Sequence, residues 1–260
     1  MRLITLLILC CSLAAYGNTA DSRLRLETEL NSATPQRQIS ILQQLVTENF
    51  KSDPPYALQH ADTLISLFES TGATGQDYLE ALRQLATLQV GQGLLDEAKA
   101  NAEKLAAGAQ QLAERNLHIQ SLKIQGVIAR IQSDYDGALD YFQRAAALAR
   151  QHDLPDAAVQ VEYEIAIIYY FMGKHADAIE LLKSIQPKVE QANNQLLAGK
   201  VLNILGIVYA NQSRFEESLD VMLTALEIQK SLKNKGAQQA LLNNIGVTYN
   251  RLGKIRQALD

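Results

Sequence analysis

Histidines and acidic pairs are the side chains from which this chain could build a reactive or metal-binding site. None of the four histidines pairs with another at i, i+4 on an expected helix or has the spacing of metal ligands: His60, His118, His152 and His175. Acidic pairs such as Glu216–Glu217 lie at the starts of expected helices, where negative charge favours the helix dipole. Phosphate-loop and hydrolase motifs are missing, and Gly91-Gln92-Gly93 falls on an expected turn. The residues therefore predict no enzyme, no cofactor and no metal site.

The N-terminal segment, 1–17, has the pattern of a secretory signal peptide. Arg2 precedes an uncharged apolar run, Leu3–Ala15, and cleavage is expected after Gly17; cleavage after Ala20 and a buried first helix are the alternatives. The run is too short to cross a bilayer, which needs about 20 apolar residues. Both cysteines of the chain lie in this run, so the mature protein would have no disulfide and no thiol nucleophile. The sequence therefore predicts an exported, periplasmic protein.

The composition argues against one class of partner. The formal net charge is −4, and no segment has the basic stripe that is typical of nucleic-acid binding. Hydrophobic residues make up 47% of the chain and charged residues 20%, which is ordinary for a soluble protein. We therefore expect no nucleic-acid partner and no membrane span in the mature chain.

A 40-residue repeat organises the chain. The stretch LNNIGVTYNRLGKIRQALD at 242–260 aligns without gaps with LNILGIVYANQSRFEESLD at 202–220. Three columns hold only Gly, Ala or Ser at five successive positions that are 40 residues apart. The columns are Ala86, Gly126, Ala166, Gly206 and Gly246; Gly93, Ser133, Gly173, Ser213 and Gly253; and Ala98, Ala138, Ala178, Ser218 and Ala258. A fixed period of this length indicates a solenoid of stacked units.

Each repeat contains the pattern of two amphipathic helices. Leu202, Leu205 and Tyr209 share one face of the first helix, and Leu219 and Met222 share one face of the second. The Gly/Ser column between them ends the first helix and permits the turn. The two other small-residue columns let the paired helices approach closely. The unit is therefore a helix hairpin that recurs with the fixed period of the three columns.

The repeat resembles the tetratricopeptide pattern, in which a small residue, an aromatic, a turn residue, a second small residue and a bulky apolar residue follow one another. The matching positions are Gly206, Tyr209, Ser213, Ser218 and Met222, and one period earlier Ala166, Tyr169, Gly173, Ala178 and Leu182. The resemblance covers residues 78–260, with Gln89 and Ala129 departing from it at the aromatic column. The usual period of the family is shorter, about 34 residues, so the helices here should be longer. The resemblance implies an all-α, right-handed superhelical solenoid of stacked antiparallel helix pairs.

The expected organisation is a signal peptide at 1–17, a capping segment at 18–33 and a solenoid of about six helix pairs at 34–260. The first pair is irregular, and Asp53 is expected to cap its second helix with Pro54 at the first helical position. Pro187 is expected to end or kink the helix in which it lies. The last pair is expected to be truncated, because the equivalent second helix of the preceding repeat continues well past Asp220.

The resemblance also implies where a ligand binds, because the first helices of tetratricopeptide pairs line the concave surface. Thr87, Val127, Ile167, Ile207 and Val247 would form an apolar floor. The predicted peptide-binding residues on either side of it are Arg83, Lys123, Arg130, Tyr163, Tyr170, Asn203, Asn243 and Asn250. Basic side chains in such a groove can hold a ligand carboxylate, while asparagine amides can satisfy a peptide backbone. The alternative is that the asparagines are merely solvated and the apolar column is core between repeats.

Two functions agree with these features. The first is a non-enzymatic scaffold in the bacterial cell envelope that binds peptide segments or partner proteins. The alternative is the periplasmic sensory segment of a membrane signalling protein, a diguanylate cyclase or histidine kinase, whose output domain would follow Asp260. Long-period repeats behind a signal peptide resemble both.

Overall fold

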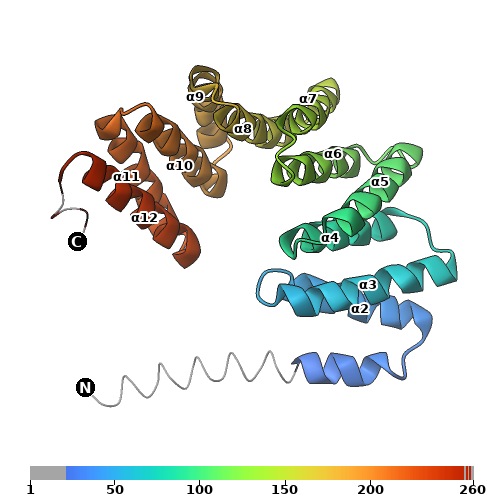
Figure 1. The fold of residues 1–260 in the computed structure, drawn as a ribbon. Helices are drawn as coiled ribbons and strands as arrows, with labels where there is room; N and C mark the ends of the chain where they lie inside the picture. Colours follow the sequence, from blue (N-terminus) through green and yellow to red (C-terminus); the bar gives the residue numbers. More distant parts are fainter. Residues whose placement is uncertain (1–21, 255, 257, 259–260) are drawn as a thin grey trace, which may run out of the picture. The chain divides into compact units, whose positions relative to one another are not determined.

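The computed structural model describes residues 22–254, 256 and 258 (Figure 1). The predicted signal peptide, residues 1–17, lies outside the described residues. The chain divides into two compact units, Met1–Leu117 and His118–Asp260, which are separate bodies in the description that follows. Helices are the only regular secondary structure in the described part of the chain. No helix among these residues is long and apolar enough to cross a membrane.

The N-terminal unit contains two helix pairs preceded by a helical segment at 22–30. Helix α2 (Pro35–Asn49) packs against α3 (Pro54–Thr71), and α4 (Gln76–Gly91) packs against α5 (Leu95–Gln111). Asp53 caps α3, because its Oδ1 accepts the backbone N–H of Tyr56 at 3.4 Å, and Pro54 is the first helical residue. This confirms the helix start predicted from the sequence.

The segment at 22–30 is fixed to the first pair by polar and apolar contacts. Arg23 forms an ion pair with Asp53 at 3.0 Å, and the Tyr56 hydroxyl donates to Glu27 at 2.7 Å. Leu26, 7% exposed, packs into the same core. These residues belong to the predicted capping segment, and their contacts cover apolar surface of α2 and α3.

The C-terminal unit continues the helix pairs with a regular length. Helix α6 (Arg115–Ile131) begins in the first unit, and the helices that follow are α7 (Tyr135–Gln151), α8 (Pro155–Phe171), α9 (His175–Gln191), α10 (Gln195–Asn211), α11 (Phe215–Ser231) and α12 (Lys235–Arg251). Each of α6 to α12 has 17 residues. Two such helices and their two short connections fill the 40-residue period.

The connections share one backbone geometry that recurs at each helix end. A residue with positive φ follows each helix from α4 to α12: Gly93, Ala113, Ser133, Asp153, Gly173, Asn193, Ser213, Lys233 and Gly253. The next N–H then donates to the carbonyl five residues earlier, as from Asp134 to Ala129 at 2.9 Å. This is the Schellman arrangement, which satisfies the last carbonyl groups of a helix. The predicted Gly/Ser turn column therefore accounts for every second connection, and four other residue types adopt the same turn.

The two predicted small-residue columns within the helices lie in the core of the helix pairs. Ala138, Ala178 and Ser218 are fully buried, as is Ala166 in the first column. Gly206 lies against Met222, and an added Cβ there would stand 2.5 Å from Met222 Cγ. The absence of a side chain at such positions lets the first helix of a pair approach a large residue of the second.

Of the two outcomes expected at Pro187, an end of the helix is wrong. Helix α9 continues past Pro187 and ends at Gln191. Ile185 and Val189 on either side of the proline are 0% and 1% exposed, so the packing of this turn outweighs the hydrogen bond that proline cannot donate.

Candidate functional site

The even-numbered helices of the C-terminal unit carry the candidate site. Direct contacts join α10 to both α8 and α12. Hydrogen bonds between side chains link neighbouring helices of this set: Lys123 donates to Gln160 at 3.1 Å, Asn211 to the Tyr170 hydroxyl at 2.9 Å, and Asn244 to Asn203 at 3.2 Å. Helices α6, α8, α10 and α12 therefore form a series with a polar surface; we call it the even-numbered row.

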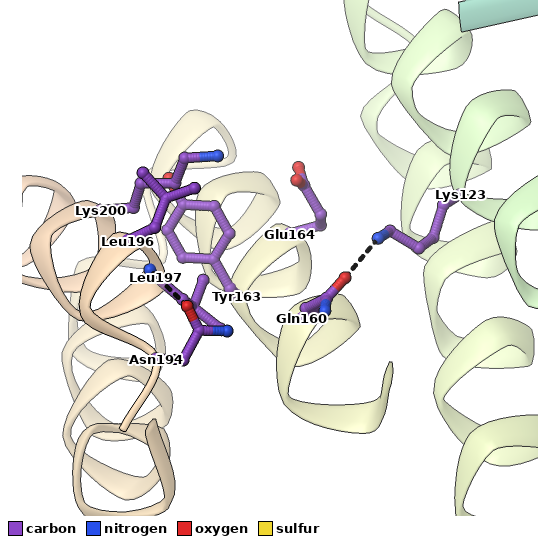
Figure 2. Close-up of a pocket in the computed structure, with 8 residues that line it drawn as sticks. All are labelled: Lys123, Gln160, Tyr163, Glu164, Asn194, Leu196, Leu197 and Lys200. Atoms are coloured by element: carbon purple, nitrogen blue, oxygen red, sulfur yellow. Dashed lines mark hydrogen bonds between the residues drawn. The ribbon is translucent and has the colours of Figure 1, made fainter. Parts of the chain in front are cut away.

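A hollow of about 220 Å³ lies between α6, α8 and α10 (Figure 2). Its lining residues are Lys123 from α6, Gln160, Tyr163 and Glu164 from α8, and Asn194, Leu196, Leu197 and Lys200 at the start of α10. Figure 2 shows Lys123 reaching towards Gln160 on one side, while Leu196 and Lys200 lie beyond the Tyr163 ring on the other. We call this space the charged hollow.

The local sequence explains how these side chains reach one space. Gln160, Tyr163 and Glu164 follow helical spacing, so they share one face of α8. Asn194 is the N-cap of α10, where its Oδ1 accepts the N–H of Leu197 at 3.1 Å. This cap fixes the first turn of α10 and with it the position of Leu196.

Charge and burial oppose each other at Glu164. Its side chain is half-buried, and burial raises the pKa of its carboxyl group above the usual glutamate value. Arg130, Lys123 and Lys200 act in the other direction, but their combined effect is smaller than that of burial. Burial also raises the pKa of the Tyr163 hydroxyl, with a contribution from Glu164. The lining of the charged hollow thus includes one carboxylate whose ionised form is disfavoured by burial and two lysines, and Arg130 acts on that carboxylate as a third cation.

A second, smaller hollow of about 140 Å³ lies between α8, α10 and α12. Two amide side chains and one aromatic ring line it, together with an apolar floor. Its lining residues are Tyr170, Ile207, Ala210, Asn211, Met222, Asn244, Val247, Thr248 and Arg251. The Arg251 guanidinium also donates to the Ala210 carbonyl at 3.4 Å. We call this space the amide hollow.

The predicted site residues fall into several environments. Lys123 and Tyr163 line the charged hollow, Arg130 acts electrostatically on Glu164 there, and Tyr170 lines the amide hollow. Asn203 accepts a hydrogen bond from Asn244.

The other three predicted residues, like Asn203 and Arg130, line neither hollow. Asn243 and Asn250 are exposed on α12. Arg83 belongs to the N-terminal unit, where it pairs with Glu80 at 2.5 Å and lines a separate hollow with Lys51.

Sequence reasoning missed Glu164, Lys200 and Asn244. The 40-residue column of Glu164 contains Gln84, Ile124, Ile204 and Asn244, which share no property. A signal was nevertheless available, because Gln160 and Glu164 flank the predicted Tyr163 on the same helix face.

No group of three or more His, Cys, Asp or Glu side chains with the geometry of a metal site occurs among the described residues. The side chains that line the two hollows can pair charges and form hydrogen bonds.

Several solved structures resemble this fold. TPR-like repeats of a kinesin light chain from Podosopora anserina match with a TM-score of 0.59 at 15% identity, over 76% of this chain and 97% of that one. A Rap protein complexed with Competence and Sporulation Factor matches with a TM-score of 0.63 at 15% identity, over 92% and 70%. The Rap conjugation gene regulator of the plasmid pLS20, in complex with the Phr* peptide, matches with a TM-score of 0.73 at 11% identity, over 86% and 62%.

These likenesses establish the class of fold. The chain is an all-α helical solenoid of the tetratricopeptide type, built from antiparallel helix pairs. Neither a protein-family pattern nor a curated protein matches the sequence.

Proposed function

We propose that the protein is a non-enzymatic scaffold that binds a peptide segment of a partner along the even-numbered row. The observation that carries this proposal is the pair of hollows on adjacent helices, one lined by charged residues and one that includes two asparagine amides. The Rap structures solved with Phr* peptide and with Competence and Sporulation Factor support it, because they have a similar fold.

The chemistry of the row suits an extended peptide. Each peptide residue brings one N–H and one C=O group that need partners, and an asparagine side chain supplies both a donor and an acceptor. Asn203, Asn211 and Asn244 provide three such amides, already aligned by hydrogen bonds between helices. In the charged hollow, Lys123 and Lys200 suit an acidic group, and Tyr163 offers a rigid flat surface.

The experiment is a peptide array probed with the protein and with single-site variants. Asn203→Ala and Tyr163→Ala should each weaken the retained peptides at least about tenfold, the loss of roughly 1.4 kcal/mol expected when a buried contact is removed. Glu180→Ala is the matched control, because Glu180 is exposed on the neighbouring helix α9. Circular dichroism establishes that each variant is folded.

Three outcomes decide the proposal. Loss of binding in the two row variants but not in the control supports it. Equal binding by all variants would move the site away from the row. A folded protein that retains no peptide above background would remove the proposal.

We further propose that the protein acts after export to the periplasm. The support is the apolar run of residues 3–15 behind Arg2. Residues 1–30 fused to a reporter enzyme that is active only in an oxidising compartment should give activity. Replacing Leu6 and Leu7 with Lys should abolish that activity, because the apolar run would be broken; unchanged activity would contradict export by this segment.

A further inference from the structure

Glu164 is an unexpected residue in a hollow suited to anions. Tyr163 beside it on α8, Lys123 and Arg130 from α6, and Lys200 from α10 are the titratable groups that face it. In Figure 2 the Glu164 side chain is seen between the Tyr163 ring and the Lys123 side chain, and Glu164 is one of the residues that line the hollow. A wholly basic hollow would bind an anion more tightly, so the Glu164 carboxylate lowers the affinity of the hollow for the proposed ligand.

The loss of affinity comes from repulsion between the ligand carboxylate and the Glu164 carboxylate. A ligand carboxylate entering the hollow would share Lys123 and Lys200 with Glu164. Two carboxylates in one site disfavour each other's ionisation, and a ligand that excludes water adds to the desolvation of Glu164. Both effects act in the same direction as the burial that the hollow itself imposes. The repulsion between the two carboxylates disappears when Glu164 takes up a proton from solution.

We infer that Glu164 is a proton-linked gate that couples the capture of a peptide carboxylate in the charged hollow to the uptake of one proton. The inference rests on the proposed peptide-binding function and adds its regulation. In the free protein Glu164 supplies the counter-charge for Lys123, Arg130 and Lys200. In the complex the ligand carboxylate takes over this role, and protonated Glu164 becomes a neutral hydrogen-bonding group. Binding is therefore tighter at lower pH.

A bound carboxylate has two sources, an acidic side chain or the C-terminus of the peptide. The probe is a set of N-acetylated hexapeptide libraries in which one position is fixed as Glu, Gln or Lys, each made with a C-terminal amide and with a free acid. Retention of the Glu-fixed amides identifies a side chain as the source. Retention of only the free acids identifies the C-terminus.

The decisive measurement is the affinity of the best-retained peptide between pH 5.5 and 8.5, by fluorescence anisotropy. Its own carboxylate remains ionised throughout this range. For the natural sequence we expect the Kd to rise with pH, with a slope of at most about tenfold per pH unit because one proton is exchanged. Glu164→Gln should give a Kd that is independent of pH and lower than that of the natural sequence at pH 8.5.

Two further variants separate the gate from other titrations. Glu180→Gln removes an exposed carboxylate on α9 and should keep the natural pH profile. Lys200→Met should weaken binding of the carboxylate peptide at every pH. The four histidines are present in Glu164→Gln, so a Kd that is independent of pH in this variant shows that they do not cause the pH dependence of the natural sequence.

The outcomes distinguish this inference from the function on which it rests. The same pH profile in Glu164→Gln and in the natural sequence would overturn the gate. So would preferential retention of Lys-fixed libraries, because Glu164 would then bind a cation directly. Retention of peptides without any preference for a carboxylate would also overturn the gate, but would leave peptide binding in place. Retention of no library by the folded protein would remove both.

Discussion

Gly126 and Phe142 meet so closely that a single methyl group would not fit between them. A Cβ added at Gly126 would stand 2.6 Å from Cε1 of Phe142, and the ring is fully buried. Helices α6 and α7 therefore approach each other through the missing side chain. This contact fixes the distance between the two helices of the pair.

Gly126→Ala should lower the free energy of unfolding by roughly 1–2 kcal/mol. Overpacking in a dense core costs about 1–3 kcal/mol, and the better helix propensity of alanine returns only part of it. Urea denaturation followed by circular dichroism measures the change. An unchanged or raised midpoint would show that the Phe142 ring has space to move.

The same column suggests a rescue for this variant. One period later, Ala166 and Leu182 occupy the equivalent positions in one core cluster. The double variant Gly126→Ala/Phe142→Leu should therefore be more stable than the sum of the two single changes predicts, by about 1 kcal/mol. Strict additivity would contradict a direct steric contact.

At the turns, unlike at Gly126, a substitution is predicted to raise the stability of the protein. Lys233 adopts φ 54° at the end of α11, whereas Gly173 adopts φ 74° at the equivalent turn after α8. Left-handed backbone costs a residue with a Cβ about 1 kcal/mol relative to glycine. Lys233→Gly should thus stabilise the protein by about 0.5–1 kcal/mol, and Gly173→Ala should destabilise it by a similar amount. Equal thermal midpoints for the two variants would contradict this geometry.

The fold was predictable where a side-chain property recurs at a fixed spacing. It was less predictable where backbone hydrogen bonds alone determine the local structure. Small residues at Ala138, Ala178 and Ser218 repeat because a larger side chain would not fit in the core. The turns at Ala113 and Lys233 were not predicted, because the Schellman hydrogen bonds that define them are made by backbone groups. Residues of several types, such as Ala, Asp, Asn and Lys, can adopt this turn when the flanking helices are packed in place.

The candidate site was predictable in part, because equivalent positions are not contacting positions. Sequence alignment relates residues one 40-residue period apart, but the hydrogen bonds from Asn211 to Tyr170 and from Asn244 to Asn203 join residues 41 apart. The alignment therefore directed attention to Asn243, which is exposed, and away from Asn244 beside it. Which of two adjacent side chains faces a neighbouring helix depends on helix packing, which the repeat pattern does not specify.

Glu162 should contribute to stability through two ion pairs. Its side chain is 12% exposed and pairs with Arg150 of α7 at 3.0 Å and with Lys188 of α9 at 3.2 Å. Glu162→Gln should lower the free energy of unfolding by about 1 kcal/mol, because one partly buried carboxylate forms ion pairs with residues of two helices. The loss should shrink in 1 M salt, where exposed charges are screened. A loss that does not depend on salt would indicate packing rather than charge as its cause.

Glu164 should affect stability with a characteristic pH dependence. Burial raises its pKa above the ordinary value of 4.5, against the opposing effects of Arg130, Lys123 and Lys200. The Glu164 carboxyl group therefore binds its proton more tightly in the folded chain than in the unfolded chain. The stabilisation that protonation gives the folded state is complete below pH 4.5 and is lost as pH rises through the raised pKa of Glu164. Glu164→Gln keeps the shape of the side chain and removes the titration. Its thermal midpoint should match that of the natural sequence at pH 4 and exceed it at pH 8. A lower midpoint for Glu164→Gln at pH 8 would show that attraction to the three cations outweighs the cost of burial.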